Sequence, residues 1–67
     1  MPEDLFPPRP SPIRVLVVDD SAVVREVLVS LLESDPDITV VGQASTGAEA
    51  VELTAALRPD LVTMDLM

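Results

Sequence analysis

The sequence predicts an α/β fold in which a doubly wound parallel sheet is built in the order β-α-β-α-β. Apolar runs that suit buried strands alternate with two segments of helical periodicity. Each helical segment ends at a proline-containing turn before the next apolar run begins. Strands that alternate with helices of this length form parallel sheets with right-handed crossovers.

The first twelve residues differ in composition from the rest of the chain. Residues 1–12 hold five of the seven prolines. Proline fixes the backbone and removes a hydrogen-bond donor, so this segment suits neither a helix nor a central strand. We therefore expect a disordered, proline-rich tail over residues 1–12 and a folded region over residues 13–67.

The folded region is expected to begin with a strand and a helix. The unbroken apolar run at residues 15–18 is typical of a strand covered on both faces. A helix is expected over residues 22–33, because apolar side chains recur there at helical spacing. Its inner face is expected to carry Val23, Val24, Val27, Leu28, Leu31 and Leu32. Its outer face is expected to carry Arg25, Glu26, Ser30 and Glu33.

A second strand is expected at residues 38–41, with a possible extension to Ala44. A second helix should follow to about Leu57, because Thr46 and Glu49 have the spacing of a capping box. Its inner side is expected to carry Ala50, Leu53, Thr54 and Leu57. A third strand is expected at residues 61–64. A doubly wound sheet normally continues beyond three strands, so residues 13–67 are expected to be a sheet truncated after the third strand and part of a larger domain.

Composition excludes several kinds of function. The net charge of −8 disfavours direct binding to nucleic acid or to an anionic membrane surface, both of which need a basic face. No apolar stretch approaches the roughly 20 residues of a membrane span. The absence of cysteine excludes disulfides and thiolate metal sites, which favours a cytoplasmic location. The only aromatic residue, Phe6, lies in the tail, so the core is expected to be aliphatic.

Three aspartates at strand ends form the most informative pattern. Asp19 and Asp20 follow the first strand, and Asp65 follows the third. Adjacent carboxylates repel each other and resist desolvation, so a hard cation between them would stabilise the pair. The carboxyl ends of parallel strands meet at one edge, and neighbouring strands are about 4.8 Å apart. If the first and third strands are neighbours, the three carboxylates converge on one pocket that suits Mg²⁺, beside which a carboxylate can attack a phosphoryl group.

Helix capping is the alternative for each aspartate considered alone. Asp20 or Ser21 can cap the first helix. Asp65 has no later helix in this chain to cap.

These motifs resemble the first half of a response-regulator receiver domain. The resemblance rests on residues 15–21, Arg25, Gly47 and residues 58–67. It implies a flavodoxin-like sheet of strand order 2-1-3-4-5, with strands one and three side by side. It also implies that Asp65 accepts a phosphoryl group from a sensor histidine kinase.

The same resemblance implies that Asp19 and Asp20 hold Mg²⁺, one directly and one largely through water. The backbone carbonyl of Met67 would be a further ligand. The family also uses a Ser or Thr after strand four and a Lys after strand five, and both would lie beyond Met67.

The receivers of chemotaxis-type protein-glutamate methylesterases are the most similar group. The likeness lies in residues 19–25, 35–38 and 62–65. It implies a C-terminal serine esterase in the same protein, regulated by phosphorylation; this chain itself carries no output catalytic domain. Three alternatives remain: a DNA-binding transcriptional regulator, a single-domain receiver, and an inactive truncated α/β interaction fragment.

Overall fold

The computed structural model describes residues 12–66. Its elements are β1 (Ile13–Asp19), α1 (Ala22–Glu33), β2 (Ile38–Ala44), α2 (Gly47–Leu57) and β3 (Leu61–Asp65). The predicted order β-α-β-α-β is therefore confirmed, and the second strand does extend to Ala44. The expected proline-rich tail lies outside the described residues except for Pro12, and so does Met67.

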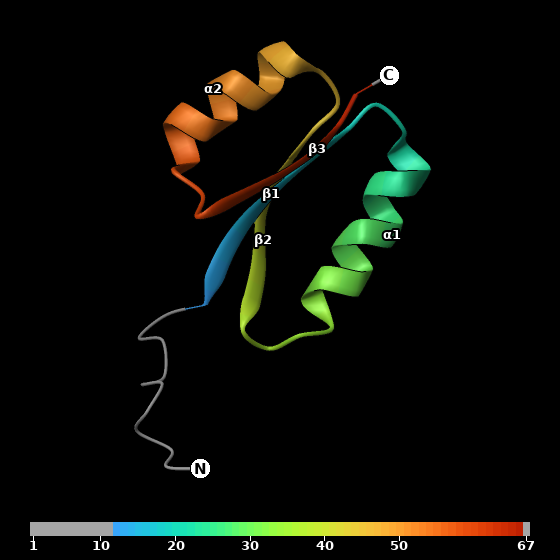
Figure 1. Ribbon diagram of the computed structural model, residues 1–67, viewed down its shortest axis with the longest axis vertical. Coiled ribbons are helices and arrows are strands. Elements are labelled where there is room, and N and C mark those ends of the chain that lie inside the picture. The colour runs from blue at the N-terminus through green and yellow to red at the C-terminus, as the bar shows by residue number, and fades with distance from the viewer. Residues whose placement is uncertain (1–11, 67) are drawn as a thin grey trace.

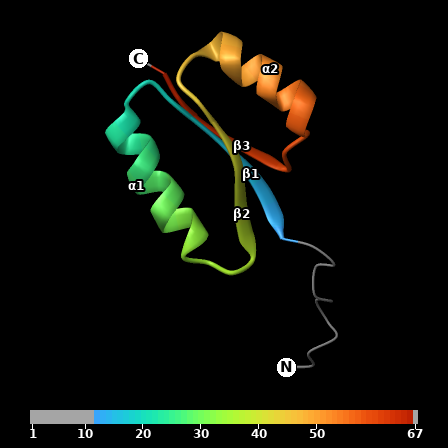
Figure 2. The ribbon, with the colours of Figure 1, turned by 180° about the vertical axis from the view of Figure 1, so that it is seen from behind.

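The three strands form one parallel sheet in the order β2-β1-β3, with β1 in the centre. Both helices contact β1 and β2. Figures 1 and 2 show α1 and α2 on opposite sides of the sheet. This arrangement follows from right-handed crossovers, because the first connection leads from β1 to one side and the second leads back past β1 to the other.

The central strand supplies most of the core. Its largest fully buried side chains are Val15, Leu16, Val17 and Val18. Burying aliphatic side chains of this size contributes roughly 1.5–3 kcal/mol each. On one face of the sheet, Leu16 and Val18 cluster with Ala44 and Ala50, and Leu53 packs against this cluster. The expectations of an aliphatic core and of a first strand covered on both faces are therefore confirmed.

Side-chain hydroxyls cap both helices. Ser21 Oγ accepts a hydrogen bond from the N–H of Val24, and Thr46 Oγ1 accepts one from the N–H of Glu49. Of the two capping candidates for α1, Ser21 is therefore the cap. The Glu49 carboxylate accepts a hydrogen bond of 2.6 Å from Ser45 Oγ, which is the largest cause of a lowered pKa at Glu49. A smaller contribution to that pKa comes from the positive charge of Arg25.

The predicted inner face of α1 is only partly correct. Leu28 and Leu32 are half-buried as expected, but four residues predicted on this face are exposed: Val23 (71%), Val24 (41%), Val27 (53%) and Leu31 (64%). The apolar stripe on α1 is wider than the surface that β1 and β2 cover. Arg25, expected on the outer face, is instead half-buried.

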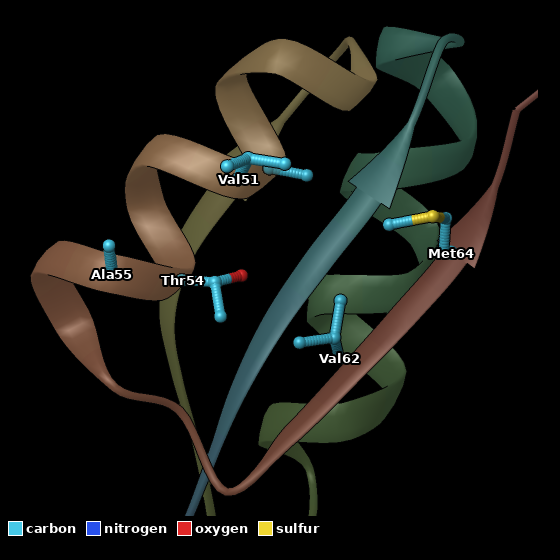
Figure 3. Close-up of a pocket in the computed structure, with 6 residues that line it drawn as sticks. Val51, Thr54, Ala55, Val62 and Met64 are labelled. Carbon is cyan, nitrogen blue, oxygen red and sulfur yellow. The ribbon is translucent and has the colours of Figure 1, made fainter.

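An apolar groove of about 380 Å³ lies between α2 and β3 (Figure 3). It is lined by Ala50, Val51, Thr54, Ala55, Val62 and Met64. Figure 3 shows Val62 and Met64 pointing from β3 into this groove, and Met64 is 58% exposed. Thr54, expected on the inner side of α2, is exposed at the groove instead. Within residues 12–66, neither helix has the length and hydrophobicity needed to cross a bilayer.

The turn between α2 and β3 is tied to the start of β1. Arg58 ends α2 in the left-handed conformation, with φ of 50°. Arg14 Nη1 donates a hydrogen bond of 2.9 Å to the carbonyl of Arg58, and the N–H of Arg14 donates to Asp60 Oδ2 at 2.9 Å. These contacts lie at the opposite end of β1 from Asp19.

Gly42 allows β2 to approach α2 closely. The register between β1 and β2 shifts between Val15 and Leu16, so that Val15 pairs with Val40 but Leu16 pairs with Gly42. A Cβ atom at Gly42 would lie 2.8 Å from Leu57 Cδ1 and 3.3 Å from Leu16 Cδ1. Both atoms are the ends of flexible side chains, so an added methyl group would be accommodated with some strain.

We predict that Gly42→Ala lowers the free energy of unfolding by about 1 kcal/mol, the lower range for overpacking a core. Amide hydrogen exchange of the β1 residues in the intact protein would measure the change. Gly47→Ala is the matched control, since its Cβ would make an ordinary contact of 3.7 Å with Leu66 Cδ1. Equal exchange rates in the two variants would contradict close packing at Gly42.

Candidate functional site

Two of the predicted site residues lie directly opposite each other at the end of the sheet. Asp19 is the last residue of β1 and Asp65 is the last residue of β3, and the two are register partners. Neighbouring parallel strands place such partners about 5 Å apart at the backbone. Figure 1 shows the ends of β1 and β3 at the same edge of the sheet, beside the turn that leads into α1.

Strand alternation places both carboxylates on the same face. Val62 and Met64 point from β3 toward the groove beside α2. Side chains alternate along a strand, so Asp65 points to the other face of the sheet, the face on which α1 packs against β1 and β2. Leu16 and Val18 occupy the α2 side of β1, so Asp19 points to the opposite side of the sheet, as its register partner Asp65 does.

Asp19 is the one buried charged residue among residues 12–66, with 3% of its surface exposed. Its Oδ1 accepts a hydrogen bond of 2.9 Å from the N–H of Ser21. Its backbone carbonyl accepts a hydrogen bond of 2.7 Å from Arg25 Nη1. A buried carboxylate is costly unless it is hydrogen-bonded or paired with positive charge. One Asp19 oxygen is satisfied in this way, and Oδ2 forms no hydrogen bond within the described part of the chain.

The other carboxylates of the site are accessible to solvent. Asp20 and Asp65 are both exposed. Asp20 does not cap α1, because Ser21 does so, and helix capping therefore does not explain the acidic doublet. Met67, the expected source of a carbonyl ligand, lies outside the described residues.

The carboxylate oxygens of Asp19, Asp20 and Asp65 are chemically suited to Mg²⁺, although the three residues do not form a complete coordination site. Among residues 12–66, no three acidic, histidine or cysteine residues are grouped closely enough to hold a metal ion. Mg²⁺ does not need such a group, since it keeps several waters and usually takes only one or two carboxylates. Asp19, Asp20 and Asp65 provide hard oxygen donors, and the chain has neither histidine nor cysteine to favour a softer metal.

Two polar residues near the site were not identified as site residues from the sequence. Arg25 was expected to face solvent, yet its guanidinium reaches back to Asp19. Its position four residues after the cap of α1, one helical turn along, was the available signal. Thr63 lies two residues before Asp65 on the same face, and its Oγ1 is a buried atom without a hydrogen-bond partner in residues 12–66.

The chain resembles known proteins over almost all of the folded region. The sequence pattern of the response regulator receiver domain family matches residues 15–67. A protein-glutamate methylesterase/protein-glutamine glutaminase of Anaeromyxobacter dehalogenans is 60% identical over 55 residues, which make up 82% of this chain and 16% of that protein. A protein of the same description from Symbiobacterium thermophilum is 62% identical over 55 residues, or 82% of this chain and 15% of that protein.

Solved structures give the same result. The response regulator domain of Thermotoga maritima CheB matches with a TM-score of 0.82 at 55% identity, over 84% of this chain and 42% of that domain. The signal receiver domain of a response regulator named NarL from Mycobacterium tuberculosis matches with a TM-score of 0.80 at 41% identity, over 84% of this chain and 45% of that one.

The agreement of sequence, topology and solved structures confirms the flavodoxin-like receiver fold that the motifs predicted. The chain spans about one sixth of the length of the curated relatives it matches. It belongs to the response-regulator receiver domain family of two-component systems, and it is similar to the receivers of chemotaxis CheB methylesterases.

Proposed function

We propose that Asp65 is the phosphoryl acceptor of this receiver and that it acts with Mg²⁺ held by Asp19 and Asp20. The observation that carries the proposal is the register of the sheet, which places Asp65 opposite Asp19 at the carboxyl ends of adjacent strands. Ligands of open parallel sheets bind at this edge. The backbone carbonyl of Met67 is a further proposed ligand.

The exposed and buried carboxylates have different roles in this proposal. Asp65 is exposed, so a phosphorylated histidine of a sensor kinase can reach its oxygen. The Asp65 oxygen attacks phosphorus, the P–N bond breaks, and the departing imidazole takes up a proton. Asp19 is buried, and the hydrogen bond from the N–H of Ser21 to its Oδ1 restrains its carboxylate. When bound, Mg²⁺ would neutralise negative charge on the phosphoryl oxygens.

We further propose that residues 13–67 form part of a larger receiver domain. The apolar groove beside α2 and the exposed Val23, Val27 and Leu31 of α1 are surfaces that additional elements would cover. The chain also matches only 42% of the length of the T. maritima domain.

The proposed output is a C-terminal methylesterase in the same protein. Relatives that are 54–62% identical carry the name protein-glutamate methylesterase/protein-glutamine glutaminase. A DNA-binding transcriptional regulator is the second candidate, because the receiver fold does not determine the output domain. The identities of 54–62% favour the esterase.

We predict that Asp65→Asn abolishes phosphorylation of the intact protein by a small phosphodonor with Mg²⁺, because an amide is not a competent nucleophile here. Intact mass and peptide mapping would detect the phosphoryl group. Asp37→Asn, at an exposed residue in the turn between α1 and β2, is the control and should be phosphorylated normally. A phosphoryl group that persists in Asp65→Asn would falsify the assignment of Asp65.

Replacement of an acidic-doublet residue should weaken metal binding. We predict that Asp20→Ala lowers the Mg²⁺ affinity of the intact protein at least about tenfold, or 1.4 kcal/mol, through loss of a charged oxygen donor. Asp19→Ala should also weaken binding. Calorimetric titration with Mg²⁺ would measure the loss, with Asp37→Ala as the control. An unchanged titration in both doublet variants would rule out this metal site.

The proposal of a partial domain predicts how residues 13–67 behave alone. A chain this short buries only about 60% of its unfolded surface, and several of its large apolar side chains are exposed. We expect a broad thermal transition, followed by circular dichroism, for the isolated segment. A sharp, cooperative transition as a monomer would contradict the proposal.

A further inference from the structure

The side chain of Arg25 forms a hydrogen bond with the backbone of the acidic doublet Asp19–Asp20. It lies in the first turns of α1 and is half-buried, and its Nη1 donates a hydrogen bond of 2.7 Å to the carbonyl oxygen of Asp19. That carbonyl belongs to the peptide group that joins Asp19 to Asp20. A charged donor at this distance makes a stronger hydrogen bond than a neutral one. The contact therefore fixes the plane of the peptide group between the two aspartates.

The backbone on the other side of Asp20 is also fixed. The N–H of Ser21 donates to Asp19 Oδ1 at 2.9 Å, and the carbonyl of Ser21 accepts the N–H of Arg25 at 3.0 Å. Asp20 thus lies between two restrained peptide groups. Its own carboxylate is exposed and makes no hydrogen bond within the described part of the chain. The orientation of the Asp20 side chain therefore depends on the orientation of those two peptide groups.

We infer that Arg25 is a positioning residue for the metal site: it aims the Asp20 carboxylate by holding the peptide group between Asp19 and Asp20. This inference rests on the proposed function of the acidic doublet in binding Mg²⁺. Arg25 itself is not a ligand, because a guanidinium carries positive charge and has no lone pair to donate.

The charge of Arg25 and its positioning effect act in opposite directions on Mg²⁺ affinity. A positive charge near the site repels a dication, so charge alone predicts tighter Mg²⁺ binding when Arg25 is replaced by a neutral residue. Loss of positioning predicts weaker binding, since residues that orient metal ligands typically change affinity tenfold to a hundredfold. The sign of the change therefore separates the two effects.

Arg14, at the start of β1, offers a matched control for Arg25. Its Nη1 also donates to a backbone carbonyl, that of Arg58, at 2.9 Å, but at the opposite end of β1. Arg14→Gln removes the same charge and the same kind of hydrogen bond. A merely structural arginine contact would affect stability in both variants and Mg²⁺ affinity in neither.

The experiment compares Arg25→Gln, Arg25→Lys and Arg14→Gln in the intact protein by calorimetric titration with Mg²⁺, at a temperature where thermal unfolding shows each variant folded. We expect about tenfold weaker binding in Arg25→Gln and unchanged binding in Arg14→Gln. Arg25→Lys keeps a charged donor and should recover part of the affinity. Equal or tighter binding in Arg25→Gln would overturn the positioning role while leaving the doublet as the metal site. No Mg²⁺ binding by the unsubstituted protein would overturn both proposals.

A measurement without metal provides an independent readout. Amide exchange of Ser21, whose N–H donates to Asp19 Oδ1, should become at least severalfold faster in metal-free Arg25→Gln because the neighbouring peptide group is released. The same amide should be unaffected in Arg14→Gln. If Arg25→Gln fails to fold, the comparison of Arg25→Lys with Arg14→Lys supplies the same two readouts. Unchanged Ser21 exchange in a folded Arg25 variant would contradict the inference.

Discussion

Burial of β1 between the two helices is the constraint on which the rest of the structure depends. Four consecutive aliphatic side chains of this strand are fully buried, and both helices contact it. A strand covered on both faces must be central, which places β2 on one side and β3 on the other. That placement alone brings the end of β3 beside the end of β1. The candidate site is thus a consequence of how the core is packed.

The same burial places a negatively charged residue, Asp19, in the interior at the end of β1. β1 continues directly from buried valine into Asp19, a residue that is only 3% exposed. Only one of its oxygens is hydrogen-bonded within the described residues, and the partner is a backbone N–H rather than a cation. Asp65 adds a second negative charge across the strand pair. A bound cation would stabilise carboxylates in this arrangement, which is the basis of the proposed Mg²⁺ site.

The sequence predicted the elements well because their signals are local. Unbroken apolar runs, hydroxyl caps at Ser21 and Thr46, and proline-containing turns gave boundaries close to those observed. The placement of Asp65 beside Asp19 was expected from the resemblance to receiver domains, whose strand order puts the first and third strands side by side. Predictions that needed tertiary contacts fared less well. The apolar stripe of α1 does not indicate which of its side chains the sheet covers. The sequence pattern likewise predicts Arg25 at the surface, because its hydrogen bond to the Asp19 carbonyl depends on the tertiary structure.

The central proposal is that the register of β1 and β3 brings Asp19 and Asp65 to one edge of the sheet, where they and Asp20 would bind one cation. Mn²⁺ prefers the same oxygen donors as Mg²⁺ and broadens the NMR signals of nearby nuclei. Titration of the intact protein with Mn²⁺, followed at the aspartate carboxyl carbons, therefore tests the claim directly. The account predicts that these three signals broaden together at the same low Mn²⁺ concentration, before that of Asp37. Broadening of the doublet without Asp65, or of Asp37 at the same concentration, would contradict it.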